Sequence, residues 1–290
     1  MLGDSNCHRR PEKFPQMFAA NSFIFVPGSR PERFAKAQAS GAGLTVIDLE
    51  DAVAAADKNT ARAAALAQVA SGGGDWAIRC NSIATAAGIA DFAAFGAAAV
   101  LPSLLLVPMV ESAVELEIIA KVLGARCPEL IPLIETPKAL RHALEIASAP
   151  RVAAVMFGGA DFSGEMGVAL AWEPLLAARS ALLLACAEAK VPAIDVPFIE
   201  LDNQAGLEAE CARARALGFA AKAAIHPAQV AAIEAAFTPT AAEVAEAEEG
   251  IAAYLEAGER AIRFKGKMLE APVAKRYRAV LSRKGNTSNA

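Results

Sequence analysis

The sequence predicts an α/β fold in which short buried strands alternate with helices, and two observations support this prediction. Short apolar runs recur along the chain, separated by segments whose apolar residues have helical spacing. Residues at the ends of these runs recur at intervals of roughly 26 to 34 residues, namely Asp48, Arg79, Val107, Glu135, Asp161, Asp195 and His226. With a first strand that ends at Val26, they make eight units, the number in a (β/α)8 barrel of about 250 residues.

Bulk composition favours a folded globular protein. Hydrophobic residues make up 55% of the 290 residues and charged residues 21%, which suits a large buried core. The net charge of −4 gives no reason to expect nucleic acid or an anionic membrane as a partner. No apolar run approaches the roughly 20 residues that a membrane-spanning helix needs. We therefore expect neither nucleic acid nor a membrane as a partner.

The chain is expected to have three parts. Residues 1–20 lack the apolar segment of a secretory signal and are expected to form a flexible leader. Residues 21–236 are assigned to the barrel, and residues 237–290 to a C-terminal helical extension that contacts a neighbouring subunit. The five cysteines are scattered without CxxC spacing, which is typical of free thiols in the cytoplasm. Three histidines are too few for a histidine-rich metal site.

The first predicted strand, Ser22–Val26, precedes a basic helix start. Ser29 is expected to cap a helix that Pro31 opens. The cationic residues near this start are Arg30, Arg33 and Lys36. They can form a solvated basic face, or they can bind a phosphate, because helix N-termini and arginines both suit anions.

An acidic cluster follows the second predicted strand, Leu44–Ile47. Asp48, Glu50 and Asp51 place three carboxylates within four residues, which is electrostatically costly without a counter-ion. Lys58, at the start of a predicted helix over 58–70, could offset them. A metal ion with its bound waters could do the same.

Arg79 ends the third predicted strand, Trp76–Ile78. An arginine at this position is expected to bind a carboxylate or an oxyanion in a cleft. A structural salt bridge to Asp48 or Asp51 is the alternative, and the two roles are compatible. The next unit has an apolar run at Leu101–Val110 and a helix over 112–123.

The stretch from residue 130 to residue 167 carries the strongest chemical signal. Two apolar runs, Leu130–Ile134 and Val152–Phe157, lead to Glu135 and Asp161, and a helix is predicted at Thr136–Ala147 between them. A strand–helix–strand unit makes its strands parallel, so both acids should emerge side by side at the carboxyl edge. Two adjacent carboxylates favour a bound cation, and Mg2+ commonly takes two carboxylates plus water or substrate. The alternative is that Asp161 caps the following helix and Glu135 is solvated.

The last units are regular. The predicted elements are a helix at Glu173–Ala189, a strand at Val191–Ile194, a helix at Gly206–Ala216 and a strand at Ala221–Ile225. His226 follows the last strand and is expected to be a packed structural residue beside Pro227, with a substrate contact as the alternative.

From about Asn21 to Leu281 the chain resembles the citrate lyase beta-subunit-like branch of the HpcH/HpaI aldolase superfamily. The matching segments are FVPGSRPERFAKA, IDLEDAV, IRCN, LIETPKAL, MFGGADFSGEMG, AIDVPF, AIHPAQV and GKMLEAPVAKR. The resemblance implies a (β/α)8 TIM barrel dependent on Mg2+, with Mn2+ as a substitute. It also implies a lyase that cleaves or forms a citryl-, malyl- or citramalyl-type thioester of coenzyme A or acyl carrier protein, releasing an oxoacid, in a homotrimer or hexamer.

The resemblance also implies roles for individual residues. Glu135 and Asp161 correspond to the metal ligands, and Glu135 also lies near the substrate. Arg79 corresponds to the residue that binds the substrate carboxylate or oxo group and stabilises the oxyanion. Glu50 and Asp51 correspond to acids that hold metal-bound waters.

Three further positions bear on the acyl carrier and on proton transfer. Arg30 and Lys36 fall where relatives approach the thioester carrier. Met109 stands where relatives often have lysine, and Cys80 stands where they have an apolar residue. Glu270 replaces an aspartate that, in relatives, reaches a neighbouring subunit's site and transfers a proton.

Two other functions are compatible with the same residues. One is an aldolase of the same superfamily that acts on free hydroxy-oxo acids, although the basic helix start favours a phosphorylated carrier. The other is a non-catalytic accessory subunit that binds a small oxoacid, although the presence of Glu135, Asp161 and Arg79 together favours an enzyme.

Overall fold

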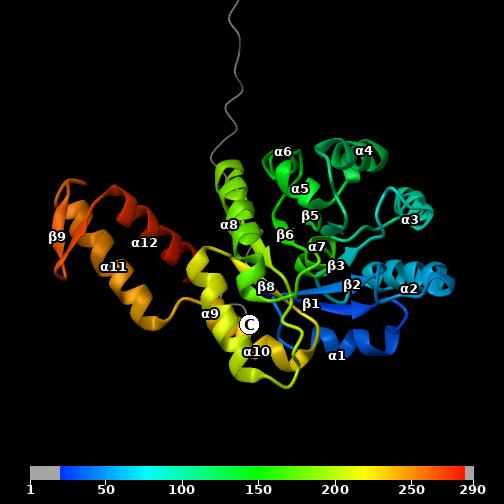
Figure 1. Ribbon diagram of the computed structural model, residues 1–290, viewed down its shortest axis with the longest axis horizontal. Coiled ribbons are helices and arrows are strands. Elements are labelled where there is room, and N and C mark those ends of the chain that lie inside the picture. Colours follow the sequence, from blue (N-terminus) through cyan, green and yellow to red (C-terminus); the bar gives the residue numbers. More distant parts are fainter. Residues whose placement is uncertain (1–19, 285–290) are drawn as a thin grey trace, which may run out of the picture.

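Eight parallel strands close into a barrel in the computed structural model, which describes residues 20–284 (Figure 1). The strands pair in chain order, and β8 pairs with β1 to close the ring. They are β1 (Ser22–Pro27), β2 (Leu44–Asp48), β3 (Trp76–Arg79), β4 (Leu104–Val107), β5 (Glu129–Ile134), β6 (Val155–Phe157), β7 (Ala193–Asp195) and β8 (Ala221–Ala224). The predicted (β/α)8 TIM barrel is confirmed.

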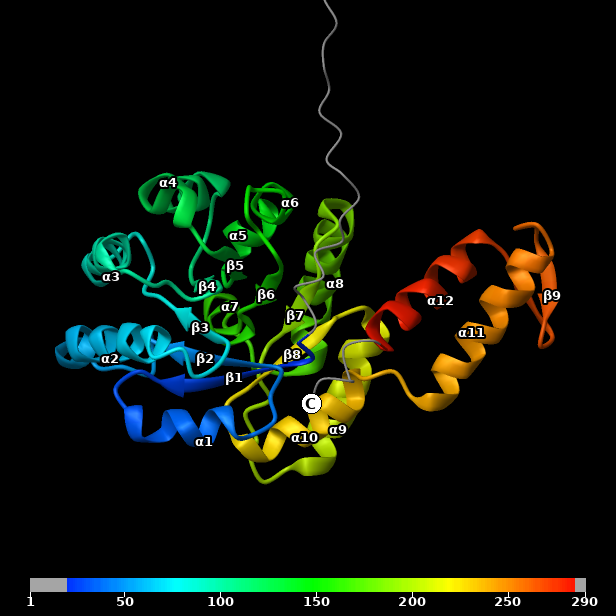
Figure 2. The ribbon, with the colours of Figure 1, turned by 180° about the vertical axis from the view of Figure 1, so that it is seen from behind.

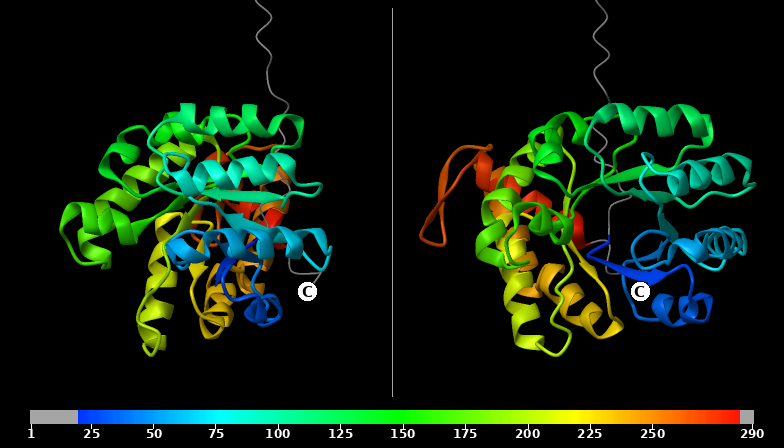
Figure 3. Two further views of the ribbon diagram at one scale, coloured as in Figure 1. Left: turned by 90° about the vertical axis from the view of Figure 1, so that its right-hand side faces the viewer. Right: turned by 45° about the vertical axis from the view of Figure 1, so that its right-hand side comes forward.

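Helices surround the strands on the outside of the barrel (Figure 3). The helices of the barrel are α1 (Phe34–Gln38), α2 (Lys58–Ala70), α3 (Ala86–Ala97), α4 (Ala113–Leu123), α5 (Pro137–Arg141), α6 (Ala143–Ala147), α7 (Gly159–Met166), α8 (Trp172–Ala189), α9 (Gln204–Leu217) and α10 (Pro227–Phe237). Short 3-10 turns lie at Pro31–Arg33, Ala55–Asp57 and Gly124–Arg126. None of the helices within residues 20–284 is long and apolar enough to cross a membrane.

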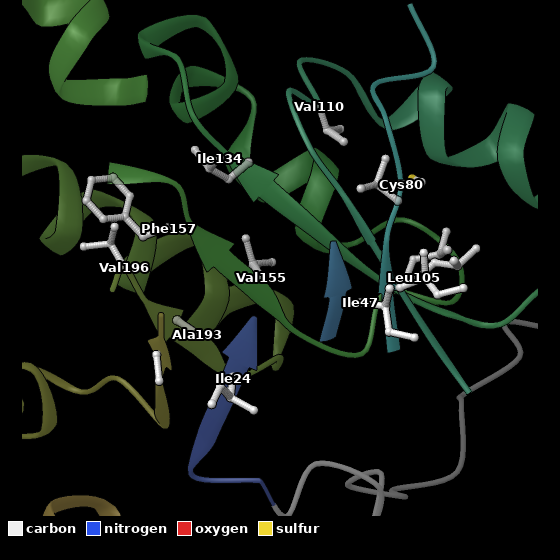
Figure 4. Packing of buried hydrophobic residues seen from close by; sticks show 14 of the residues in the cluster. Ile24, Ile47, Cys80, Leu105, Val110, Ile134, Val155, Phe157, Ala193 and Val196 are labelled. Carbon is white, nitrogen blue, oxygen red and sulfur yellow. The ribbon is translucent and has the colours of Figure 1, made fainter. Parts of the chain in front are cut away.

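The buried strand residues divide between two apolar layers. Phe23, Val46 and Leu106 pack with other strand residues inside the barrel. Their chain neighbours Ile24 and Ile47 belong to a second cluster, which also contains helix residues and so lies between strands and helices (Figure 4). Alternate residues of a strand face opposite sides, so an all-apolar strand can serve both layers at once.

Local details differ from the sequence-based expectations in two places. The expected cap at Ser29 is wrong: a 3-10 turn starts directly at Pro31, so Arg30 occupies the flanking position, without a side-chain hydrogen bond. The helix expected at Thr136–Ala147 is divided into α5 and α6 at His142. The other strands and helices for which a range was predicted lie within a few residues of the observed bounds. No range was predicted for α3, α7 or α10.

The chain continues beyond α10 into α11 (Ala241–Glu256), a hairpin of β9 (Ile262–Phe264) and β10 (Lys267–Leu269), and α12 (Ala271–Lys284). This C-terminal unit projects from one side of the barrel (Figures 1 and 2). It has its own apolar cluster, which includes Tyr254, Leu269 and Tyr277. Arg283 links its end to the barrel by donating to the Asn21 side chain and the Ala220 carbonyl. Residues 1–19, which make up nearly all of the expected leader, lie outside the described residues.

Candidate active site at the carboxyl end of the barrel

The predicted site residues of the barrel lie at the carboxyl ends of their strands or just after them, and strand pairing holds these ends side by side. Asp48 and Arg79 are paired at the ends of β2 and β3. Ile134 and Phe157 are paired at the ends of β5 and β6, and these strands are followed by Glu135 and by α7, which carries Asp161 in its first turn. The carboxyl ends of barrel strands form the mouth at which enzymes of this architecture place their active sites.

Arg79 is held by an acidic cradle. Its Nε and Nη2 donate to the two carboxylate oxygens of Asp48 at 2.7 and 2.6 Å. Its Nη1 lies 2.7 Å from Oε2 of Glu50 and 3.6 Å from Oδ2 of Asp51. Burial alone would lower the pKa of Arg79, but the surrounding carboxylates raise it above its ordinary value. The guanidinium is therefore a fixed positive charge at the mouth.

Lys58 contacts the main chain of the acidic cluster and not its carboxylates. Its ammonium donates to the main-chain carbonyls of Leu49 and Glu50, at 2.8 and 2.7 Å. It thereby holds the loop that follows β2. The charge of Asp48 is instead balanced by Arg79, through a two-point ion pair.

Glu135 is 2% exposed and tightly placed. Its Oε2 accepts a 2.6 Å hydrogen bond from the amide of Met109, whose φ of 54° is the left-handed conformation. A Cβ atom on Gly158 would lie 2.1 Å from Cγ of Glu135, so only glycine leaves room for this side chain. Burial raises the pKa of Glu135 to about 7. The alternative of a solvated Glu135 is therefore wrong.

The pKa values of Asp161 and Glu50 are also raised. Burial and the charge of Asp51 raise the pKa of Asp161. Burial, opposed in part by Arg79, raises the pKa of Glu50 to about 8. Asp161 does not cap α7, because Gly158 holds that position and Asp161 lies inside the first turn. The site thus contains more carboxyl groups than its one arginine neutralises.

These residues fit a hard divalent cation. Glu135 and Asp161 offer carboxylate oxygens, the ligands that Mg2+ prefers. The Oε2 atom of Glu50 is buried and lies 2.7 Å from Nη1 of Arg79, but it accepts no hydrogen bond within the described part of the chain. Within residues 20–284, no group of three or more His, Cys, Asp and Glu side chains is arranged to enclose a metal. A cation here would therefore take few protein ligands and complete its coordination with water or substrate, as Mg2+ does.

Other predicted residues lie outside this cluster. Arg30 and Lys36 are exposed near the start of α1, and Arg30 lies 3.9 Å from Glu32. Glu270 is exposed at the start of α12, in the C-terminal unit that projects from the barrel. Within one chain, Glu270 therefore does not lie at the barrel mouth that contains Glu135.

His226 and Asp195 have structural contacts. The expectation that His226 is packed is wrong, because it is exposed and its Nδ1 accepts a hydrogen bond from the amide of Ala228 at the start of α10. Asp195 is fully buried between Arg179 and Lys222, which donate to its two oxygens at 2.9 and 2.7 Å.

Asp91 supports the site and was missed by the sequence reasoning. It is fully buried on α3 and accepts hydrogen bonds from the amide and side chain of Asn81, at 2.7 and 2.8 Å. Arg62 balances its charge at 2.6 Å. These contacts anchor the loop that follows Arg79. The available signal was an acid within the otherwise apolar segment GIADFAAF, which predicts a paired buried carboxylate.

The chain has recognisable relatives. Residues 21–227 match the family model described as HpcH/HpaI aldolase/citrate lyase. The mitochondrial citramalyl-CoA lyase of Rattus norvegicus is 31% identical over 284 residues, covering 89% of this chain and 84% of that protein. A (3S)-malyl-CoA thioesterase of Cereibacter sphaeroides (strain ATCC 17029 / ATH 2.4.9) is 35% identical over 244 residues, covering 81% of this chain and 83% of that protein.

Solved structures share the architecture. The CitE protein of Mycobacterium tuberculosis, solved with magnesium, acetoacetate and coenzyme A, superimposes with a TM-score of 0.78 and 31% identity. That match covers 92% of this chain and 99% of the other. RipC of Yersinia pestis gives a TM-score of 0.70 and 41% identity over 77% of this chain and 97% of the other.

Proposed function

Because the chain belongs to the HpcH/HpaI aldolase/citrate lyase family, we propose that it is a Mg2+-dependent carbon–carbon lyase. Its substrate is a β-hydroxyacyl thioester of the citryl, malyl or citramalyl type, which it cleaves to an oxoacid and an acyl thioester or forms from them. The observation that carries this proposal is the cluster of Glu135, Asp161 and the fixed cation Arg79 at one barrel mouth. The relatives named for citramalyl-CoA and malyl-CoA support the substrate class.

Glu135 and Asp161 are proposed to hold the metal. A bound Mg2+ would supply Lewis acidity and a template for the oxygens of a hydroxy or oxo acid. The amide of Met109 fixes one oxygen of Glu135, which leaves the other for a ligand. Glu50 and Asp51 are proposed to orient metal-bound waters, since both lie beside Arg79 at the same mouth.

Arg79 is proposed to stabilise negative charge on the reacting oxygens. Cleavage breaks the bond between the hydroxyl-bearing carbon and the α-carbon of the thioester. The hydroxyl loses its proton and becomes the oxo group of one product, while the electron pair of the broken bond goes to the α-carbon as an enolate. A proton added to that carbon completes the acyl thioester. A guanidinium already held by Asp48 suits this role because it needs no reorganisation.

The remaining contacts are proposed to come from the chain surface and from a second subunit. Arg30 and Lys36 are exposed cations suited to the phosphates of coenzyme A or of a carrier protein's prosthetic group. Glu270 is proposed to act in proton transfer at a neighbouring subunit's site, within a homotrimer or hexamer. Its exposed place on the projecting C-terminal unit supports this arrangement.

The cytoplasm is proposed as the compartment. Cys80, Cys127, Cys186 and Cys211 are buried and free, as expected of a protein in a reducing environment. The citramalyl-CoA lyases among the relatives are mitochondrial. Fractionation of cells therefore tests directly whether this protein is in the cytoplasm.

A thioester hydrolase is the second candidate, because the Cereibacter sphaeroides relative of 35% identity is named a thioesterase. Hydrolysis breaks the carbon–sulfur bond and leaves the carbon skeleton intact. The two activities therefore give different products from the same substrate.

Product analysis tests the proposal. The protein is incubated with Mg2+ and either malyl-CoA or citramalyl-CoA, and products are identified by mass spectrometry. The lyase proposal predicts acetyl-CoA with glyoxylate or pyruvate. Free coenzyme A with malate or citramalate supports the hydrolase. Cleavage only of free hydroxy-oxo acids would indicate the aldolase, and oxoacid binding without turnover would indicate an accessory subunit.

A further inference from the structure

Glu111 joins two loops at the carboxyl end of the barrel. It lies in the loop after β4, and its carboxylate accepts hydrogen bonds from two residues that follow β5. Its Oε1 accepts from the hydroxyl of Thr136 at 3.0 Å, and its Oε2 accepts from the ammonium of Lys138 at 2.7 Å. The amide of Glu111 donates to Oε1 of Glu115 at 3.0 Å, which fixes its own main chain to the first turn of α4. One carboxylate therefore ties the loop after β4 to the start of α5.

The same short loop holds Glu135. Met109 precedes Glu111 by two residues, and its amide donates to Oε2 of Glu135 at 2.6 Å. Val110, between them, is fully buried. The loop after β4 therefore contacts the segment after β5 twice, once through the Met109 amide and once through the Glu111 carboxylate.

Met109 needs this support. Its φ of 54° is a left-handed conformation, which costs free energy for a residue with a side chain and persists where the surrounding contacts hold it. Burial of Val110 holds the loop against the core, but apolar burial has no preferred direction. The hydrogen bonds of Glu111 are directional. They are therefore the contacts that can keep the Met109 amide in line with Glu135.

The two partners of the Glu111 side chain contribute differently. The Lys138 side chain is 58% exposed, and ion pairs at exposed positions contribute little to stability. Thr136 is 4% exposed, and its hydroxyl oxygen accepts from the amide of Ala139 as the cap of α5. The proton of that hydroxyl goes to Glu111, and a buried donor that loses its acceptor costs free energy. The bond from Thr136 is therefore the stronger link between the two loops.

We propose that Glu111 is a positioning residue for Glu135. By accepting from the Thr136 hydroxyl, it holds the loop after β4 so that the Met109 amide stays on one oxygen of Glu135 and leaves the other for a ligand. Glu111 acts through Met109 and not on the substrate. Its effect on Mg2+ rests on the proposed role of Glu135 as a metal ligand, whereas its hold on the loop does not.

Crystal structures and titration calorimetry of three variants test this role. In Glu111→Ala the Met109 amide is expected to move beyond hydrogen-bond distance of Glu135. Mg2+ affinity is expected to fall about 10- to 100-fold, the usual effect of removing a residue that supports a metal ligand. Glu111→Gln keeps an acceptor oxygen for Thr136 and should bind Mg2+ within about threefold of wild type. Lys138→Met removes only the exposed ion pair, and as the matched control it should also bind like wild type.

The outcomes distinguish this proposal from the proposed function. An intact hydrogen bond between Met109 and Glu135 in crystals of Glu111→Ala, or wild-type Mg2+ affinity in that variant, would overturn the positioning role. A loss in Glu111→Gln or Lys138→Met equal to that in Glu111→Ala would also overturn it, because the bond from Thr136 would then not be what holds the loop. If wild type itself binds no Mg2+, the metal role of Glu135 fails instead, and the crystal comparison still decides whether Glu111 holds the loop. Glu111→Ser, whose shorter side chain does not reach Thr136, replaces the alanine variant should that variant not fold.

Discussion

Arg79 and Asp48 form a two-point ion pair between neighbouring strands, with Nε–Oδ1 and Nη2–Oδ2 distances of 2.7 and 2.6 Å. The two residues are also register partners at the ends of β2 and β3. The pair fixes the plane of the guanidinium, and the third nitrogen, Nη1, lies beside Glu50 and Asp51. A structural contact and a catalytic role are therefore compatible in Arg79.

Arg79→Lys tests that dual role. Lysine keeps the charge but cannot donate to both oxygens of Asp48 in a fixed plane. We expect kcat to fall by about 100- to 1000-fold, the usual cost of removing a preorganised oxyanion donor. Arg179→Lys is the control, because it disturbs another buried arginine–aspartate pair, which makes no ion pair with Glu135, Asp161 or Arg79 within the described residues. Its melting temperature should fall while kcat is retained. Near-normal kcat in a folded Arg79→Lys protein would assign Arg79 a structural role alone.

Gly158→Ala tests the placement of Glu135. The added Cβ would lie 2.1 Å from Cγ of Glu135 and must push it out of position. We expect Mg2+ affinity and turnover to fall about tenfold or more, a free-energy change of about 1.4 kcal/mol. Gly164→Ala, within the same α7 helix, is the control, because nothing lies within 4 Å of its added Cβ. Titration calorimetry measures the Mg2+ affinity of both variants, and a cleavage assay measures their turnover. Equal Mg2+ affinity in the two variants would contradict the placement of Glu135 at the metal.

Removal of the metal should have a pH-dependent effect on stability. Burial raises the pKa of Glu135 from its ordinary 4.5 to about 7 in the folded protein. Its contribution to metal-free stability is therefore fully present below about 4.5 and lost as pH rises through about 7. Mg2+ binds the ionised form, so the Mg2+-induced rise in melting temperature should be larger at pH 8 than at pH 5.5. In Glu135→Gln the rise should be absent at both pH values. A rise of equal size at both in wild type would contradict the assignment.

Glu270 offers a test of a site shared between subunits. Glu270→Ala and Asp161→Ala should each be inactive as purified proteins. When the two are mixed under conditions that allow subunit exchange, some sites combine an intact Asp161 with an intact Glu270. Activity should then return to a fraction of the wild-type level. A mixture that exchanges subunits but stays inactive, or an active monomer in light scattering, would rule out the shared site.

The barrel could be predicted from the sequence because each strand–helix unit repeats the same physical pattern. The strand predicted at Trp76–Ile78, for example, is a short apolar run that leads to Arg79, and it matches β3. The apolar run at Leu101–Val110, interrupted by Pro102 and Pro108, was the least clear strand, and only Leu104–Val107 forms β4. Local caps were harder to predict. Ser29 is a good capping residue, but the turn that starts at Pro31 places Arg30 at the cap instead.

The site was predictable in its residues but not in its contacts. Strand order brings Glu135 and Asp161 to neighbouring positions, and this followed from the strand–helix–strand pattern. The hydrogen bond from Met109, which needs a positive φ, and the space left by Gly158 depend on backbone geometry that residue types alone do not specify. The same holds for His226, whose exposure was not evident from its place beside Pro227.

Dependence of carbon–carbon cleavage on the metal tests the central claim most directly. Cleavage of malyl-CoA or citramalyl-CoA is measured in excess chelator and again after Mg2+ or Mn2+ is restored, for wild type, Glu135→Ala and Asp161→Ala. The proposed site predicts that wild-type cleavage stops in chelator and returns with the metal. It also predicts that both variants stay folded but inactive in either condition. Full cleavage by wild type in excess chelator, or metal-dependent cleavage by both variants at the wild-type rate, would contradict a metal site at Glu135 and Asp161.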